Sequence, residues 1–258
     1  VASTIEGAPA RAAGILSGDE FLAVDGDPLT GLSVDQAVLK VRGAEGTTVV
    51  ITVLTGDAEP RDVSIVRAKI ELPAVATKQL QTVAGSRVDY IALNEFTDIA
   101  AGQFHDALQK IIDAGGDKIV LDLRDDPGGY LSTALAIASE FIADGVVYIE
   151  ENSKGERSGT SAQGGGVATD AAIQLVVLIN KGSASASEIL AGALRDRGRA
   201  VLVGETTFGK GVVQTFIDLK DGSGLKLTIA KWLTPNGTWV NKVGLAPDYP
   251  VPTPLTPG

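Results

Sequence analysis

The chain has 258 residues, of which 22 are basic and 32 acidic, so its formal net charge is −10. This charge disfavours partners that must be held by a basic surface, nucleic acid above all. The absence of cysteine and the single histidine, His105, exclude disulfides, a cysteine nucleophile, and zinc sites built on cysteines or two histidines. We expect neither a metal nor any other cofactor.

Residues 1–70 are predicted to form a small domain with its own turn signals. Alternating apolar residues predict strands at residues 21–24 and 49–53. Ser33 is expected to cap a helix that runs through Val41.

Three motifs in this small domain resemble the second half of a PDZ domain. They are Ala-Pro-Ala-x-x-Ala-Gly at 8–14, Gly-Asp-x-x-Leu-x-Val-Asp-Gly at 18–26 and Gly-Leu-Ser-x-x-x-Ala at 31–37. The resemblance implies a truncated domain that keeps the helix beside the peptide groove. The loop that grips a chain terminus would then lie upstream of Val1.

Residues 71–258 are expected to form a larger domain, entered through a linker-like passage. A strand is predicted at residues 90–93, and Thr97 or Asp98 should cap the amphipathic helix that follows. His105 lies beside the apolar face of this helix, and no motif supplies it with an acidic partner. We interpret it as a surface histidine.

An apolar strand at residues 119–123 ends in Arg-Asp-Asp-Pro-Gly-Gly, after which a helix is predicted at residues 131–141. This can be an ordinary strand-to-helix loop. However, acyl transfer needs backbone N–H donors for the developing oxyanion, and Gly128 and Gly129 would let a substrate carbonyl approach the backbone closely.

Residues 151–170 are polar and rich in glycine and serine. This composition predicts a mobile loop, either a lid or a surface excursion.

Two turns carry candidate chemistry. The apolar run at residues 175–179, typical of a parallel sheet covered on both faces, leads into Gly-Ser-Ala-Ser-Ala-Ser-Glu before a predicted helix, which places Ser185 for nucleophilic attack. A second strand, at residues 200–203, leads to Lys210, which is flanked by glycines and followed by Gln214. A lysine in this position is suited to act as the base.

Two other interpretations compete for these turns. Ser185 and Glu188 fit an S-x-x-E capping box, in which the serine merely caps the helix. Gly204 to Lys210 match a phosphate-binding loop, but Gly211 stands where Ser or Thr is required and residues 212–217 are strand-like. The mismatch disfavours phosphate binding.

Taken together, the two turns resemble those of the carboxyl-terminal processing peptidases, serine proteases with a Ser/Lys pair. The resemblance implies that Ser185 is the nucleophile, Lys210 the base and Gln214 a residue one helical turn on that supports the lysine. It implies an oxyanion hole made of Gly128 or Gly129 with Ala186. Members of the family usually carry asparagine where this chain has Asp125 and Asp126, so two extra charges are expected near the hole.

The resemblance covers nearly the whole chain and implies an α/β fold with a crotonase/ClpP-like protease core of β-β-α units. Segments 216–219 and 225–232 are predicted strands joined by a turn at 221–224, and Thr-Pro-Asn-Gly at 234–237 with Gly-Leu-Ala-Pro-Asp at 244–248 also match the family. A lysine base must be neutral, and we expect the following residues to bury it: Val203, Phe208, Val212 and Val213.

The implied activity is serine endopeptidase cleavage near the carboxyl termini of proteins bound in extended form. Two rivals remain, a non-catalytic PDZ-type peptide-binding scaffold and a crotonase-like acyl-CoA enzyme. A homo-oligomer or a regulatory adaptor is possible.

No apolar run approaches the ~20 residues that a membrane helix needs, and the chain opens at Val1 without an initiator methionine. We expect a mature or trimmed form without stable membrane insertion. The family implies an extracytoplasmic location, either periplasmic or secreted and including the periphery of a membrane, with the thylakoid lumen as the alternative.

Overall fold

The computed structural model describes residues 8–16, 18–32, 34–56, 58–68, 73–218 and 223–252. The chain divides into two compact units, with the division between Leu72 and Pro73. Each unit has its own hydrophobic core.

The first unit is a four-stranded antiparallel sheet in the order β2-β1-β3-β4. Its core is made by alternate residues of β1, β3 and β4, together with Ile15. The two strands predicted from alternation are confirmed. Ser33, the expected helix cap, lies outside the described residues. The elements are α1 (Pro9–Ala12), β1 (Glu20–Val24), β2 (Asp27–Pro28), α2 (Val34–Val41), β3 (Thr48–Leu54) and β4 (Arg61–Val66).

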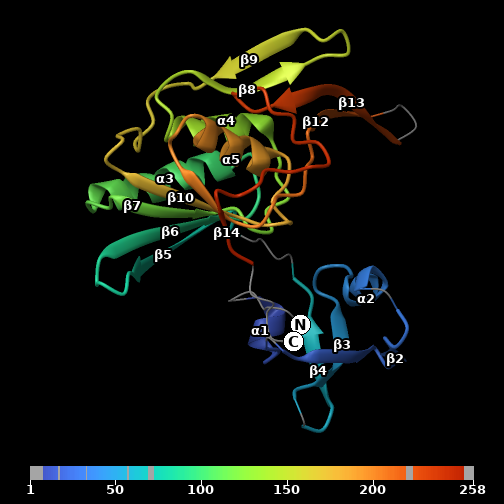
Figure 1. Cartoon of the computed structure of the whole chain (residues 1–258). Helices are drawn as coiled ribbons and strands as arrows, with labels where there is room; N and C mark the ends of the chain where they lie inside the picture. The colour runs from blue at the N-terminus through green and yellow to red at the C-terminus, as the bar shows by residue number, and fades with distance from the viewer. Residues whose placement is uncertain are drawn as a thin grey trace. The chain divides into compact units, whose positions relative to one another are not determined.

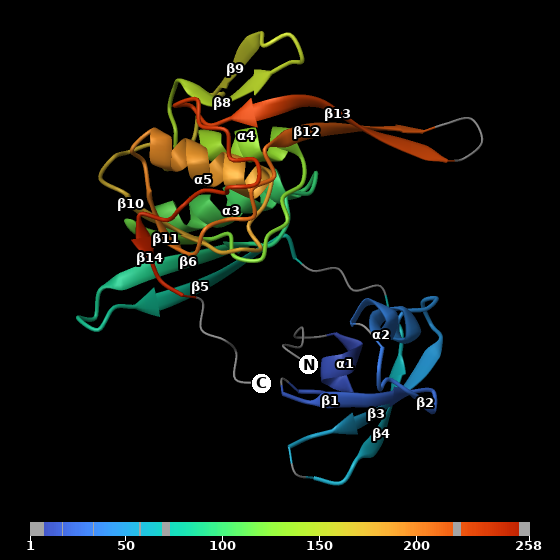
Figure 2. The ribbon, with the colours of Figure 1, turned by 45° about the vertical axis from the view of Figure 1, so that its right-hand side comes forward.

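The second unit has three layers, a six-stranded sheet, a layer of helices and a four-stranded sheet (Figures 1 and 2). The six-stranded sheet has the order β14-β11-β10-β7-β6-β5 and is parallel except for β5. Its strands are β5 (Val75–Gln81), β6 (Arg87–Leu93), β7 (Lys118–Asp122), β10 (Gln174–Ile179), β11 (Val201–Gly204) and β14 (Tyr249–Pro250).

Helices α3 (Ala100–Asp113), α4 (Leu131–Ser139) and α5 (Ala186–Asp196) lie between the two sheets. The second sheet has the order β12-β13-β8-β9. Its strands are β8 (Val146–Glu151), β9 (Arg157–Ser161), β12 (Val212–Asp218) and β13 (Gly224–Leu233).

The six-stranded sheet is buried on only one face, which differs from the expectation of a doubly covered sheet. On β10, the alternate residues Leu175, Val177 and Ile179 are buried in the helix-facing core, whereas Val176 and Leu178 are only half-buried. A continuous apolar run therefore does not by itself establish that both faces are covered.

Three local predictions need correction. Helix α3 starts at Ala100, and Ile99 occupies its N-cap position, because a turn separates Thr97 and Asp98 from the helix. Helix α4 ends at Ser139, two residues before the predicted end. The β-β-α order occurs at β5-β6-α3 and at β9-β10-α5, but α4 follows the single strand β7 directly.

The segment expected to be a mobile loop is partly regular structure. Strand β9 pairs antiparallel with β8, and Gln163 donates its backbone N–H to Oγ of Ser139 at 3.0 Å. Gly166 packs so closely on the backbone of Ser139 that no side chain would fit. These contacts anchor the glycine-rich part of the segment to the end of α4.

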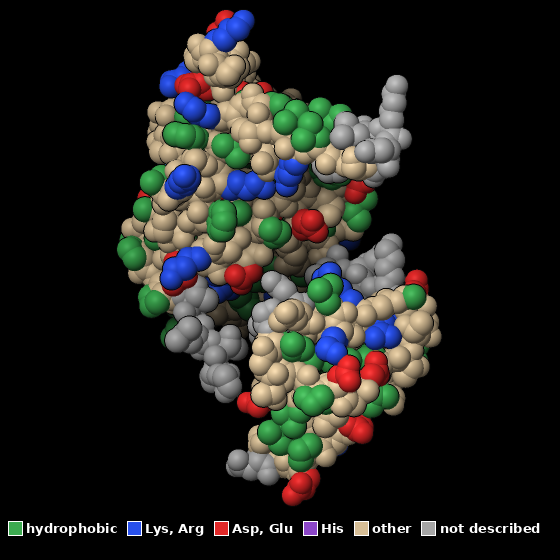
Figure 3. Space-filling view, turned by 90° about the vertical axis from the view of Figure 1, so that its right-hand side faces the viewer, with side chains coloured by type: hydrophobic (Ala, Val, Ile, Leu, Met, Phe, Trp, Pro, Cys, Tyr) green, Lys and Arg blue, Asp and Glu red, His purple; other side chains and the backbone are tan. Residues whose placement is uncertain are grey.

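Strands β12 and β13 form a hairpin, as the β-branched residues after Lys210 predicted. Of the predicted connecting turn at 221–224, residues 221 and 222 lie outside the described part of the chain, and Gly224 begins β13. Figure 3 shows apolar side chains gathered on this hairpin, beside the grey atoms. The exposed apolar residues of the hairpin are Ile217, Leu225, Leu227 and Ile229.

Candidate active site

Ser185 stands at a sharp turn between strand β10 and helix α5. Its backbone angles, φ 58° and ψ −114°, are rare for any residue that carries a side chain. Such strain at a strand-to-helix turn is a feature that exposes a serine hydroxyl in hydrolases. The turn therefore presents Ser185 at the end of the sheet rather than in the core.

The two neighbouring serines of the motif are in a different state. Ser183 and Ser187 are fully buried, and their hydroxyls donate to the backbone carbonyls of Leu123 (2.7 Å) and Asp126 (2.9 Å). Ser185 is only partly buried and lines a pocket of about 680 Å³. Of the three serines, the structure leaves Ser185 in a position to meet a ligand.

Lys210 lines the same pocket from the segment between β11 and β12. The indole of Trp232 donates to its backbone carbonyl at 2.8 Å, and the indole of Trp239 donates to that of Gly211 at 2.8 Å. Both tryptophans of the chain thus hold this segment. The pocket is lined by Glu95, Phe96, Thr97, Asp98, Gly129, Tyr130, Leu131, Ser132, Ser185, Lys210, Val212, Val213, Gln214 and Lys226.

The environment of Lys210 differs from the expected apolar enclosure. Phe208 is 65 % exposed and so cannot bury the lysine, whereas Val203, Val212 and Val213 are half-buried. Among the described residues, no carboxylate lies within 4.0 Å of its Nζ.

Glu188 joins the serine turn to the lysine segment. Its Oε2 accepts the backbone N–H groups of both Ser185 (2.9 Å) and Lys210 (2.8 Å). Its Oε1 accepts the N–H of Gly209 (2.8 Å) and the hydroxyl of Thr207 (2.5 Å). The glutamate does reach back as a capping box requires, but it also fixes Lys210, so capping and chemistry are not alternatives here.

We expect Glu188→Gln to lower the free energy of unfolding by about 2–4 kcal/mol, because one amide group cannot accept from four buried donors. Urea denaturation measures this loss, and cleavage by the folded fraction should also fall because both turns lose their common anchor. Glu59→Gln, the same exchange at an exposed glutamate of the first unit, is the control. Wild-type stability in Glu188→Gln would contradict the anchoring role.

Gln214 lies on strand β12, not on a helical turn after Lys210. It lines the pocket, and its side-chain amide is 3.4 Å from the hydroxyl of Thr228. No hydrogen bond joins it to Lys210 among the bonds of the described residues. The predicted residue is therefore in the site, while the predicted contact is absent.

The Pro-Gly-Gly loop lies against the serine turn. A Cβ added to Gly128 would be 2.9 Å from Cβ of Ser185 and 2.8 Å from the backbone nitrogen of Ala186, so only glycine fits. The N–H of Gly128 donates to Oδ1 of Asp126 at 2.8 Å. Within the described part of the chain, no group accepts the N–H of Gly129 or Ala186, so Gly129, not Gly128, has an N–H available.

The start of the Pro-Gly-Gly loop is stabilised by a cluster of polar residues that was not predicted from the sequence. Asp122 accepts hydrogen bonds from Arg124 (2.6 Å) and from the hydroxyl of Tyr90 (2.6 Å). Burial alone would raise the pKa of Asp122, but these hydrogen bonds outweigh burial and lower it. Burial and the hydrogen bond to Asp122 raise the pKa of Tyr90 to about 12.

His105 has an acidic partner after all, because its Nδ1 lies 2.8 Å from Oε1 of Glu140. Neither residue lines the pocket that holds Ser185. The pair links α3 to the end of α4, and no motif in the sequence predicts this contact.

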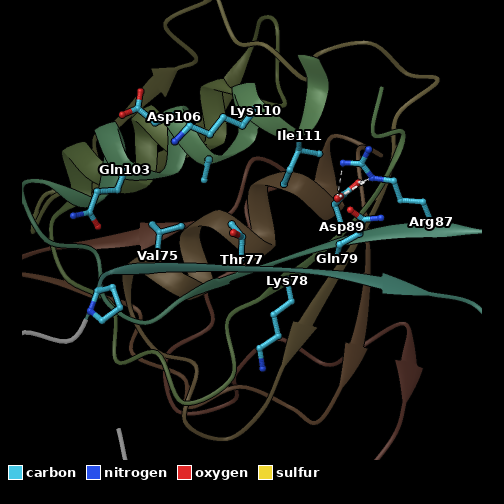
Figure 4. A pocket seen from close by; sticks show the side chains of 12 residues that line it. Val75, Thr77, Lys78, Gln79, Arg87, Asp89, Gln103, Asp106, Lys110 and Ile111 are labelled. Carbon is cyan, nitrogen blue, oxygen red and sulfur yellow. Dashed lines mark hydrogen bonds and ion pairs between the residues drawn. The ribbon is translucent and has the colours of Figure 1, made fainter. Parts of the chain in front are cut away.

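A second pocket, of about 590 Å³, lies between α3 and the edge strand β5 (Figure 4). The ion pair of Arg87 and Asp89 lies at one end, with 2.9 Å between Nε and Oδ2. Within the described residues, no cluster of acidic or histidine side chains could hold a metal. No helix in that part of the chain is long and apolar enough to cross a membrane.

Comparison with known proteins gives two matches to families. Residues 87–251 match peptidase family S41, and residues 1–55 match the PDZ domain.

The curated relatives include a carboxyl-terminal-processing protease of Synechocystis, 39 % identical over 99 % of this chain and 59 % of its own. A probable CtpA-like serine protease of Staphylococcus aureus is 42 % identical over 98 % of this chain and 50 % of its own. The chain thus spans between half and three-fifths of the length of these relatives.

Two solved structures resemble the whole chain. The photosystem II D1 C-terminal processing protease is 32 % identical with a TM-score of 0.69, over 98 % of this chain and 68 % of that one. A putative S41 protease of Bacteroides fragilis, 20 % identical over 97 % of this chain and 70 % of that one, has a TM-score of 0.74. The second likeness concerns the fold alone.

Proposed function

Since the chain belongs to peptidase family S41, we propose that it is a serine endopeptidase that cleaves proteins near their carboxyl termini, with Ser185 as nucleophile and Lys210 as base. We further propose that residues 71–258 form its protease core, of the crotonase/ClpP-like kind, and that residues 1–70 are a partial PDZ domain.

The observation that carries the proposal is the contrast among the three serines. Only Ser185 combines a strained backbone, partial exposure and a place in the pocket that Lys210 also lines. The other two hydroxyls are buried and already donate to carbonyls. A structural serine would not need φ of 58°.

In the proposed mechanism, neutral Lys210 accepts the hydroxyl proton while Oγ of Ser185 attacks the peptide carbonyl carbon. The N–H groups of Gly129 and Ala186 donate to the resulting oxyanion. The lysine ammonium then gives its proton to the leaving amine, which leaves an acyl ester on Ser185. Water, deprotonated by Lys210, hydrolyses the ester and restores both groups.

Gln214 would reorient toward the ammonium when substrate fills the pocket. Its weak contact with Thr228 leaves the side chain free to do so.

The substrates proposed are protein carboxyl termini in extended form, as the names of the relatives suggest. We propose an extracytoplasmic setting, with the thylakoid lumen as the alternative that the D1-processing relative suggests. A homo-oligomer or a regulatory adaptor stays a prediction.

Labelling with a fluorophosphonate tests the proposal directly. We expect one adduct per chain, on Ser185, found by mass spectrometry of the digested protein, and weaker labelling in Lys210→Ala. A peptide-binding scaffold would give no adduct. An acyl-CoA enzyme would instead show a thermal shift with a CoA thioester and no cleavage of peptides.

A further inference from the structure

Asp126 lies between the Pro-Gly-Gly loop and the serine turn. Its side chain is completely buried, and its backbone carbonyl accepts the N–H of Ala184 at 3.0 Å and the hydroxyl of Ser187 at 2.9 Å. The residue therefore contacts both segments that flank Ser185.

The carboxyl of Asp126 is incompletely satisfied. Oδ1 accepts the N–H of Gly128 at 2.8 Å, but Oδ2 is buried and has no hydrogen-bond partner within the described residues. Burying an ionised carboxylate that has one oxygen without a hydrogen-bond partner costs much more free energy than burying the neutral acid. Burial accordingly raises the pKa of Asp126 to about 7, against the opposing effects of the Gly128 N–H and the Ser187 hydroxyl.

The surrounding charges do not offset this burial. Glu95, on the segment before α3, raises the pKa of Asp126 further. Arg124 of the same loop is paired with Asp122, and Glu188 of α5 is occupied by backbone donors. The remaining charged residues on these segments and on the facing pocket wall are Asp98, Asp125, Lys181, Lys210 and Lys226. No described cation lies within 4.0 Å of the Asp126 carboxyl.

We propose that Asp126 is a positioning residue of the oxyanion loop whose carboxyl must be protonated for full turnover, an inference that rests on the proposed function of Ser185. In the neutral acid, Oδ1 of Asp126 accepts the N–H of Gly128. This hydrogen bond fixes the loop so that the N–H of Gly129 can donate to the oxyanion. Ionisation places a negative charge one hydrogen bond away from Gly128, whose Cα lies against Ser185. That charge opposes the oxyanion that forms during attack.

The expected consequence is a rate that falls as pH rises through about 7. Asp126→Asn keeps an oxygen acceptor for Gly128 and cannot ionise, so the falling limb should disappear. We expect kcat/KM equal to wild type at pH 6 and on the order of tenfold higher at pH 8.5. The control is Asp117→Asn, the same exchange at an exposed aspartate outside the pocket lining, which should follow the wild-type profile.

Two measurements do not depend on turnover. In protein labelled with ¹³C at aspartate, the carboxyl resonance of Asp126, assigned with Asp126→Asn, should titrate with a midpoint near 7. In the unfolded chain the pKa of an aspartate is about 3.9. Between this pH and the midpoint near 7, the folded state binds one more proton than the unfolded state, so the free energy of unfolding falls as pH rises. The difference in Tm between Asp126→Asn and wild type should therefore increase, in favour of the variant, from pH 4 to pH 8.

The proposal is overturned if the resonance titrates below pH 5, or if the profiles of Asp126→Asn and wild type superimpose. A folded Asp126→Asn that is inactive at every pH would also overturn it, since the carboxyl itself would then be required. Wild type that cleaves no peptide, with a midpoint still near 7, would instead refute the proposed peptidase function.

Discussion

Replacement of Ser185 by alanine is expected to lower peptide cleavage by roughly 10⁴–10⁶-fold, because the attacking oxygen is lost while the fold is kept. The measurement is kcat/KM on an unfolded peptide substrate, together with the Tm of the same sample. A serine that only caps α5 would behave otherwise, costing about 0.5–2 kcal/mol of stability and leaving turnover in the folded fraction intact.

Ser183→Ala and Ser187→Ala are the matched controls, since each removes the same atom from the same motif. Their hydroxyls donate to Leu123 and Asp126, so their loss should reduce stability but leave measurable cleavage. Cleavage by Ser185→Ala at the rate of these controls would rule out the nucleophile.

Replacement of Lys210 by arginine or by alanine is expected to lower turnover by at least roughly 10³-fold in both cases. Arginine keeps the charge but cannot give up its proton, so it cannot accept one from Ser185. Single-turnover kinetics of both variants measure this loss.

Lys231→Arg provides the control for this exchange. Lys231 is paired with Glu151 and stacked over the ring of Trp239, outside the pocket lining, so arginine there should leave the rate close to wild type. Substantial turnover in Lys210→Arg would refute the lysine base and redirect the search to His105, the one histidine of the chain.

The amino-acid sequence by itself determined the parts of this protein that depend on local patterns. Alternating apolar residues located β1 and β3, and the β-branched run after Lys210 located β12. The two turn motifs identified the family, and their residues Ser185, Lys210 and Gln214 do line one pocket. Such motifs are readable because the chemistry needs particular residue types at a fixed spacing.

Tertiary structure decided what the same motifs could not distinguish. The motif contains three serines that the sequence pattern alone does not distinguish. Two of them, Ser183 and Ser187, are buried and donate their hydroxyls to the carbonyls of Leu123 and Asp126, which leaves Ser185 as the candidate nucleophile. Phe208 looked suited to bury Lys210 but faces solvent, because sequence proximity does not fix side-chain direction.

The most consequential contacts join segments that are far apart in the chain. Glu188 looked like half of a capping box, but its carboxylate also binds the backbone of Gly209 and Lys210, some twenty residues away. Asp126 was expected only as an extra charge near the oxyanion hole, yet it is fully buried and its Oδ2 has no hydrogen-bond partner among the described residues. Burial and long-range hydrogen bonds arise only when the chain folds, and they set which charges exist in the site and which N–H groups remain available for substrate.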